Sequence, residues 1–243
     1  MCEVQSCFKR YEKKYLLTQD QYLAMQRGMA PYMVPDAHPE YTICNIYYDT
    51  EQDELIRTSL EKPVYKEKLR LRSYGVPGNR DPVFIELKKK YDGVVYKRRI
   101  TMNAPDAMRY LQGAHKRDDS QIGREIDWFL QFYRPAPKVF IAYEREAWAA
   151  ADGGELRITF DTDLRARSNN VDLRFGDDGV PILAEDLYLM EIKIPGTAPL
   201  WLSQLLSANQ IFSTSFSKYG TYYTQFVLGG KSAAIPKEVL LSA

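Results

Sequence analysis

The sequence predicts an α+β protein in which an antiparallel β-sheet closes into a barrel and helices pack on the outside of it. Segments in which polar and apolar residues alternate recur along most of the chain, and turns rich in Gly, Asn and Pro separate them. The polar positions of these segments are rich in Lys and Arg. In a closed sheet, the cations of several strands would meet in one enclosed space.

The composition fits one globular domain. Of the 243 residues, 45% are hydrophobic and 27% are charged, which is ordinary for a protein with a sizeable core. We expect a single domain over residues 1–243, with its core at about 8–228 and a short C-terminal tail. Because the formal net charge is only +1, a polyanion partner would have to be recognised by cations gathered on one surface.

The first half of the chain is expected to be mainly strand. Alternating, β-branched and aromatic residues place strands at 8–17, 41–49, 64–74, 83–91 and 94–102. Thr18 has the side chain of an N-cap for a helix that runs to about Gly28, and residues 51–60 read as a second, short helix. Residues 31–39 begin and end with Pro and are expected to be a loop. Asp92-Gly93 predicts a tight hairpin turn between the last two of these strands.

The second half mixes helices and strands. Residues 104–134 lose the two-residue period, and apolar residues such as Ile122, Ile126 and Phe129 share one helical face, so two helices are expected there. Strands are expected at 138–149, 155–165 and 187–194, with turns at the glycines and asparagines between them. A helix at 199–209 and another that begins near Ser217 complete the chain.

Cysteine, histidine and hydropathy patterns exclude several classes. Cys2, Cys7 and Cys44 are odd in number and have no paired spacing, so a disulfide framework or a zinc site is not expected. The two histidines, His38 and His115, lie beside loop-like segments and are expected at the surface. No apolar run approaches the roughly 20 residues of a spanning helix and the start lacks an apolar signal core. We therefore expect a cytoplasmic protein.

Side chains two residues apart on a strand share a face, which sorts the polar positions into rows. The residues in these rows are Arg10, Glu12 and Lys14; Lys66, Lys68, Arg70 and Arg72; Glu86, Lys88 and Lys90; Lys97 and Arg99; and, on the later strands, Tyr143, Arg145, Arg157, Thr159, Asp161, Glu191 and Lys193.

These rows have two readings. Each could be the solvated outer face of an antiparallel sheet, which is the usual fate of alternating polar residues. Repetition over many strands and the excess of cations over acids favour the other reading, in which the rows line the inside of the barrel. Like charges in a row repel one another unless interleaved carboxylates or a shared anion compensate them. The second reading predicts that the interior binds a polyphosphate or a nucleoside triphosphate.

Nucleic acid is a less favoured partner for such a basic surface. The aromatic residues of the strands do not form an interleaved stacking platform, and no nucleic-acid-binding motif is present. The sequence also lacks GxxxxGK[ST], so a P-loop mechanism is not expected. Phosphate groups without bases fit the pattern better.

Several short segments combine a cation or carboxylate with a fixed spacing. They are Lys68-x-Arg70-x-Arg72, Glu86-x-Lys88, Tyr143-x-Arg145, Arg157-Ile158-Thr159, Glu191-x-Lys193 and Phe216-Ser217-Lys218. Together, and in this order, they resemble the polyphosphate polymerase domain of the vacuolar transporter chaperone (VTC) family, within the triphosphate tunnel metalloenzyme (CYTH-like) superfamily. The resemblance covers about residues 8–223. One departure is Ser215, at a position where the polymerases often carry Lys.

The resemblance implies an eight-stranded tunnel that transfers the γ-phosphate of ATP to a growing polyphosphate chain with the help of a divalent metal, Mn²⁺ or Mg²⁺. It implies catalytic roles for Arg70, Arg72, Lys88, Arg145, Arg157 and Lys218, phosphate-binding roles for Lys14, Lys68, Lys97, Arg99, Tyr143, Lys193 and Ser217, and a metal ligand in Glu191. ATP and inorganic polyphosphate are then the expected partners, without nucleic acid or membrane insertion by this chain.

Two other functions remain open for the same fold. Hydrolytic tunnel enzymes generally use paired carboxylates in the first and last strands to hold metals that activate water. Here these places hold one carboxylate each, Glu12 and Glu191, which favours holding a phosphate chain over two-metal hydrolysis, although Glu12 and Glu86 could still help hydrolysis. A noncatalytic polyphosphate-binding module is the third reading. The sequence leaves the oligomeric state and any membrane-protein partner undecided.

Overall fold

The computed structural model describes residues 11–92, 94–114, 118–194 and 196–229. Within these residues, one antiparallel sheet has ten strands in the order β10-β1-β9-β7-β6-β2-β3-β4-β5, with β8 beside β7. The strands are β1 (Tyr11–Thr18), β2 (Met33–Asp49), β3 (Tyr65–Tyr74), β4 (Pro82–Tyr91), β5 (Val94–Asn103), β6 (Ala136–Ala150), β7 (Arg157–Arg167), β8 (Val180–Pro181), β9 (Leu187–Ile194) and β10 (Ser213–Thr214).

The helices are α1 (Gln19–Met29), α2 (Glu54–Leu60), α3 (Ala104–Leu111), α4 (Gln121–Tyr133), α5 (Leu200–Ala208) and α6 (Lys218–Tyr222), and α6 continues into the π-helical segment η1 (Tyr223–Leu228). The predicted cap of α1 is confirmed: Thr18 and Gln21 form a reciprocal capping box. Ser217 caps α6 in the same way, because its side chain accepts a hydrogen bond from the backbone N–H of Gly220.

The prediction of a closed, eight-stranded barrel is wrong. Over the part of the chain that the structure describes, the sheet is open, with β5 at one edge paired only with β4 and β10 at the other edge paired only with β1. Closure would require these two edges to exchange backbone hydrogen bonds. The two-residue strands β8 and β10 add to the count and are too short to show an alternating pattern. The antiparallel α+β class itself is confirmed.

Most predicted elements are present, with one clear exception. Of the expected loop at 31–39, residues 33–39 are instead the start of β2, where Pro35 lies opposite Trp148 before a register shift that ends at Glu40. Proline is tolerated there because an irregular stretch of strand does not require every N–H to donate. Predictions that concern Cys2, Cys7, Arg10, Gly93, His115 and the C-terminal tail fall outside the described residues.

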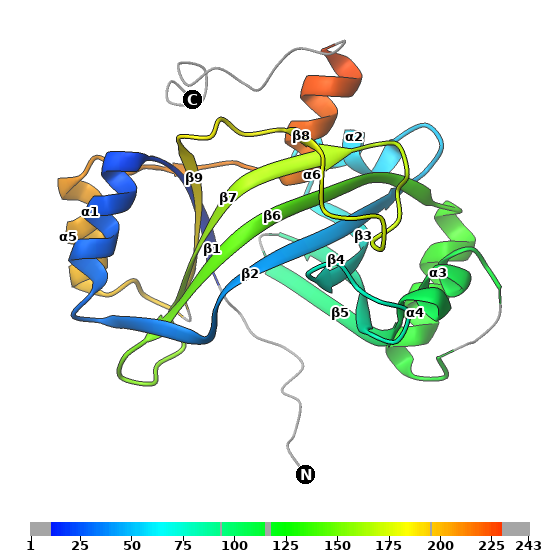
Figure 1. Cartoon of the computed structure of the whole chain (residues 1–243), viewed down its shortest axis with the longest axis horizontal. Helices are drawn as coiled ribbons and strands as arrows, with labels where there is room; N and C mark the ends of the chain where they lie inside the picture. Colours follow the sequence, from blue (N-terminus) through cyan, green and yellow to red (C-terminus); the bar gives the residue numbers. More distant parts are fainter. Residues whose placement is uncertain (1–10, 93, 115–117, 195, 230–243) are drawn as a thin grey trace.

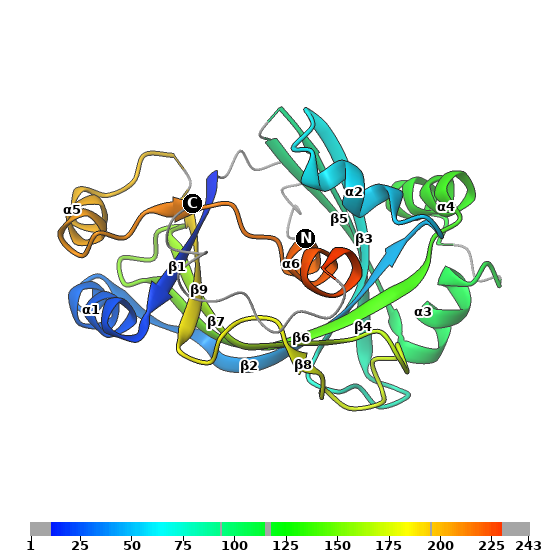
Figure 2. The same cartoon turned by 90° about the horizontal axis from the view of Figure 1, so that it is seen from above.

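The sheet curves, and different helices cover its two faces. On the convex face, α1 and α5 pack on one half and α3 and α4 on the other (Figure 1). On the concave face lie α6 and η1, whose apolar side chains pack against strands β2, β6, β7 and β9 (Figure 2). One part of the concave face is therefore an apolar core, and the polar rows occupy the rest.

Candidate functional site

The concave face collects cations from most of the strands. Strand register places Lys14 beside Glu191, Glu12 beside Lys193 and Lys88 beside Lys97 on this face. It carries, among the predicted residues, Lys14, Lys68, Arg70, Arg72, Lys88, Lys97, Arg99, Tyr143, Arg145, Glu191 and Lys193, and α6 adds Ser217 and Lys218. The carboxylates interleaved with them are Glu12, Glu86, Asp161 and Glu191, so positive charge is in excess.

Glu86 is the centre of the first cluster, at the β3–β5 side of the face. Its fully buried carboxylate accepts hydrogen bonds from Arg70 Nε at 2.7 Å and Arg99 Nε at 2.8 Å, and it lies 2.6 Å from Lys97 Nζ. Arg72 Nε approaches it to 3.8 Å. Despite its burial, the pKa of Glu86 lies well below its ordinary value because Arg70, Arg72 and Lys97 stabilise the charged form.

Asp161 is the centre of the second cluster. This buried carboxylate accepts two hydrogen bonds from Arg145, at 2.6 and 2.8 Å, and one from Lys218 Nζ at 2.6 Å. Lys218 Nζ also lies 4.1 Å from the centre of the Tyr143 ring, and Arg72 donates to the Tyr143 hydroxyl at 3.3 Å. Burial acts to raise the pKa of Tyr143, but the nearby Arg72, Arg145 and Lys218 outweigh it and lower that pKa.

Two lysines of the face bind neutral acceptors rather than carboxylates. Lys14 Nζ donates to the carbonyl oxygen of Phe216 at 2.9 Å, and Lys68 Nζ lies 3.1 Å from Ser217 Oγ. Burial is the main reason that the pKa of Lys14 falls to about 8 and that of Lys68 to about 7. An anion bound between them would supply a negative charge beside both ammonium groups and would favour their protonated forms.

Side chains also bridge strands that share no backbone hydrogen bonds. Glu12 on β1 lies 3.5 Å from Lys88 on β4, and β1 and β4 are not paired in the sheet. The open sheet is therefore drawn together across its concave face by polar contacts.

Arg157 departs from the predicted arrangement. Its register partner is Lys193, but its Nη1 donates to the carbonyl oxygens of Gly154 and Leu156 at 2.9 and 3.0 Å. Its side chain is 40% exposed, and Nε lies 3.9 Å from Asp36 at the beginning of β2. It lies at the start of β7 and does not join the two clusters.

The residues around Glu191 fit one kind of metal site. Within the described ranges, no three His, Cys, Asp or Glu side chains gather as a ready-made set of ligands. Glu191 is paired in register with Thr159, whose buried hydroxyl has no hydrogen-bond partner there. Because Mg²⁺ and similar cations often take one or two carboxylates and complete their shell with phosphate oxygens and water, these residues fit a metal shared with a phosphate ligand.

Sequence reasoning gave Glu86 a role only in the hydrolytic alternative and read Asp161 only as a balance for neighbouring Arg. Glu86 and Asp161 appeared in the polar rows, and Asn45 did not appear at all, although its Oδ1 accepts a hydrogen bond from Arg72 at 2.9 Å. A lone acid within a row of cations was the available signal for Glu86. Nothing in the apolar segment around Asn45 marks it.

The family comparison matches most of the chain. The model of the VTC domain matches residues 9–227, and no curated protein sequence matches the chain. No helix among the described residues is long and apolar enough to cross a membrane.

Two solved structures share the fold at low identity. A putative adenylate cyclase from Bacillus halodurans is 13% identical with a TM-score of 0.55, over 88% of this chain and 96% of that chain. A putative adenylyl cyclase from Hippeastrum, described as having a dominant triphosphatase activity, is 14% identical with a TM-score of 0.51, over 88% of this chain and 94% of that chain. The antiparallel α+β fold is thus similar to that of triphosphate tunnel proteins, and with a family match over residues 9–227 the chain belongs to the VTC domain family.

Proposed function

We propose that the concave face binds ATP and inorganic polyphosphate and that the protein transfers the γ-phosphate of ATP to the end of a polyphosphate chain. The observation that carries this proposal is the excess of converging cations over carboxylates on one face. Lys14 and Lys68 in particular are partly buried cations whose side-chain hydrogen bonds, among the described residues, go to a carbonyl and a hydroxyl oxygen. A linear polyanion would neutralise such a surface along its whole length.

Phosphoryl transfer suits this face because the reaction needs positioning and charge neutralisation more than a protein nucleophile. An oxygen of the terminal phosphate of the chain would attack the γ-phosphorus, the bond from that phosphorus to the β–γ bridging oxygen would break, and ADP would leave. Arg70, Arg72 and Arg145 would hold phosphate oxygens, and Lys218 would neutralise developing charge beside Asp161.

Glu191 would hold a divalent metal, Mn²⁺ or Mg²⁺. When bound, such an ion would neutralise charge on the phosphate oxygens that it shares with the protein. Thr159 offers its unpartnered hydroxyl at the same place.

A second candidate is hydrolysis of a triphosphate. It is favoured by the fold shared with the Hippeastrum protein that is described as a triphosphatase. Binding of polyphosphate without turnover is the third possibility.

One experiment separates the three. Purified protein is incubated with ATP and Mn²⁺, and chains are detected by staining after gel electrophoresis while free phosphate is measured in the same samples and with tripolyphosphate as substrate. Chains support the polymerase, free phosphate from tripolyphosphate supports the hydrolase, and binding without either product leaves only the third function.

A matched pair of variants ties the product to the concave face. Lys14→Met should lower product formation by about tenfold or more, since a cation at the reacting phosphates is lost. Lys13→Met is the control, because Lys13 is exposed on the opposite face of the same strand, beside Ile192. Equal activity of the two variants would contradict a site on this face.

A further inference from the structure

A β-bulge lies at the centre of the candidate site. The register of β6 with β7 shifts between Ala142 and Glu144, so that Tyr143 stands opposite two residues, Asp163 and Leu164. Asp163 has a φ of 47°, in the left-handed region that residues with a side chain adopt less often. The extra residue is therefore held in place by its surroundings.

The bulge decides which side chains of β7 face the site. Before it, Asp161 lies on the concave face; after it, Leu164 and Ala166 belong to the concave apolar core. Uninterrupted alternation would have carried Asp163 and Arg165 to the concave face as well. The bulge turns Arg165 to the outer face.

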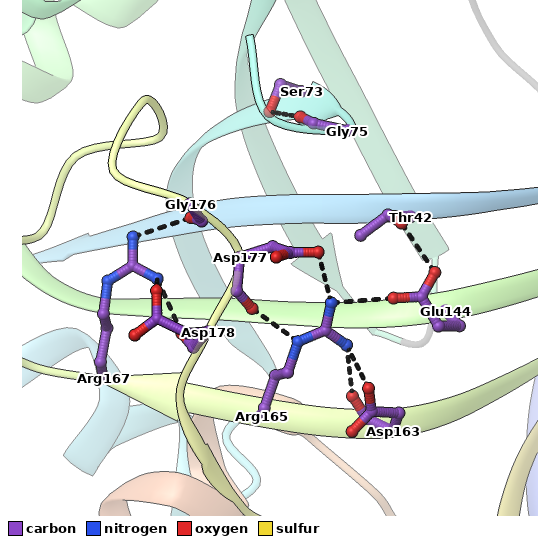
Figure 3. Close-up of polar contacts among 10 residues, drawn as sticks. All are labelled: Thr42, Ser73, Gly75, Glu144, Asp163, Arg165, Arg167, Gly176, Asp177 and Asp178. Atoms are coloured by element: carbon purple, nitrogen blue, oxygen red, sulfur yellow. Dashed lines mark hydrogen bonds and ion pairs between the residues drawn. The ribbon is translucent and has the colours of Figure 1, made fainter.

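On that outer face, Arg165 binds both sides of the bulge. Its Nη1 donates to the backbone oxygen of Asp163 at 3.0 Å and to its carboxylate at 2.7 Å, and its Nη2 donates to Glu144 at 2.8 Å and Asp177 at 2.7 Å (Figure 3). Thr42 on β2 donates to the other oxygen of Glu144 at 2.7 Å. The Arg165 side chain is only 11% exposed, whereas the carboxylates of Glu144, Asp163 and Asp177 are 43%, 62% and 44% exposed.

The same bulge presents two groups to the concave face. Tyr143, opposite the extra residue, contacts Arg72 and the ammonium group of Lys218. Asp161, two residues before it, accepts hydrogen bonds from Arg145 and Lys218. A change in the backbone conformation of β7 at the bulge would move the Tyr143 and Asp161 side chains together.

We propose that Arg165 is a positioning residue for the phosphate site and acts from the opposite face of the sheet by holding the Asp163 bulge, which sets the places of Tyr143 and Asp161. The inference deepens the proposed function and rests on it for the identity of the ligand. Arg165 touches no ligand itself; it acts through the backbone between the two faces.

The test begins with tripolyphosphate binding measured by calorimetry at fixed salt. Arg165→Met should raise Kd by about tenfold or more, as loss of a supporting contact behind a binding group commonly does. Arg165→Lys keeps the charge but has a single donor nitrogen, so its Kd should fall between those of Arg165→Met and the unaltered protein. Arg174→Met is the control: Arg174 pairs with Asp172 at 2.7 Å in the segment that follows β7 and has no contact with the bulge. Its Kd should stay within about twofold of that of the unaltered protein.

A second readout needs no ligand. The ionisation of Tyr143 is measured by ultraviolet titration, as the difference between each protein and the same protein carrying Tyr143→Phe. Arg165→Met should raise the pKa of Tyr143, because the phenol would move away from Arg72, Arg145 and Lys218. Thermal unfolding of every variant measures its stability. A general loss of stability would not by itself shift the pKa of Tyr143.

The outcomes separate the two proposals. If the unaltered protein binds no tripolyphosphate, the proposed function fails and the Tyr143 titration alone decides the role of Arg165. If Arg165→Met leaves the Tyr143 titration unchanged while the protein remains folded, the positioning role is wrong. If Arg165→Met does not fold, Arg165→Lys decides the question. An unchanged Tyr143 titration and an unchanged tripolyphosphate Kd in Arg165→Lys would then overturn the positioning role of Arg165.

Discussion

Single residues on the concave face show how burial and charge compete. Lys14 and Lys68 keep partly buried ammonium groups close to a carbonyl and a hydroxyl, and desolvation lowers their pKa values to about 8 and about 7. Lys218, which is more deeply buried, has a raised pKa because the Asp161 carboxylate accepts a hydrogen bond from it. The neighbour, and not burial alone, decides whether a lysine here carries its charge at neutral pH.

This contrast predicts a pH dependence of binding. A bound polyanion favours protonated Lys68, so tripolyphosphate affinity should fall as pH rises above 7, by up to about tenfold per pH unit for one linked proton. The stability of the free protein should change in the opposite direction. Because the unfolded chain holds the Lys68 proton up to its ordinary pKa of 10.5 and the folded protein releases it near 7, unfolding becomes less favourable over this range.

Calorimetry from pH 6.5 to 9 checks the first effect, and denaturant unfolding checks the second. Lys68→Met should make tripolyphosphate affinity depend less steeply on pH, because the linked proton of Lys68 is lost. Lys13→Met should leave the pH dependence unchanged. An equally steep change in Lys68→Met would assign the proton to another group.

At the scale of elements, Glu86 joins three strands that carry like charges. Arg70 and Arg72 on β3 and Lys97 and Arg99 on β5 surround this one carboxylate on β4. Cations so close together repel, and the buried carboxylate offsets that repulsion. These four cations thus share the Glu86 carboxylate.

Glu86→Gln should therefore destabilise the free protein by about 3 kcal/mol, since the loss of one member of a buried ion-paired cluster leaves the others uncompensated. Tripolyphosphate should raise the melting temperature of this variant more than that of the unaltered protein, because the ligand would replace the lost charge. Thermal unfolding with and without tripolyphosphate measures both effects. Glu125→Gln, at a partly exposed contact with Lys89 and Arg98, is the control.

Acid should have a related effect. The pKa of Glu86 in the folded protein lies below its ordinary value of 4.5, so its contribution to stability is complete above that pH and declines as the pH falls below it. The acid-induced loss between pH 5 and 3 should be smaller in Glu86→Gln. An unchanged acid transition would mean that other carboxylates dominate it.

At the scale of the whole molecule, one short segment connects distant strands. Phe216 accepts a hydrogen bond from Lys14 of β1, Ser217 contacts Lys68 of β3, and Lys218 binds Asp161 of β7. Tyr219 donates to Asp49 at the end of β2 at 3.2 Å. The start of α6 therefore links the two halves of an open sheet across its concave face (Figure 2).

Tyr219→Phe tests this link. Asp49 is buried and also accepts hydrogen bonds from the backbone of Leu55 and Ile56, so loss of the tyrosine hydroxyl should cost about 1 kcal/mol of unfolding free energy. A smaller effect on tripolyphosphate affinity should accompany it, since Lys218 adjoins the altered residue. Urea unfolding provides the measurement, and Tyr222→Phe, which alters a tyrosine packed on Phe226 in the same segment, provides the control. Equal losses in the two variants would show that the Asp49 contact adds nothing of its own.

Much of the fold followed from local patterns. Two-residue alternation located the long strands, and Thr18 and Ser217 marked helix starts, because strand faces and caps depend on neighbours in the chain. The same alternation placed Arg70, Lys88 and Lys97 on one face. Residues 33–40 were missed because their prolines and charged residues read as a loop, whereas pairing with β6 makes them strand.

The sequence by itself determined that cations of many strands share one face, since alternation along each strand depends only on the pleat. Only the tertiary structure decided that the sheet stays open, that Glu86 and Asp161 each collect several of these cations, and that Arg157 does not join them. It also decided that an extra residue at Asp163 sends Arg165 to the outer face. Register, bulges and edge pairing depend on residues far apart in the chain, and no pattern within a single strand specifies them.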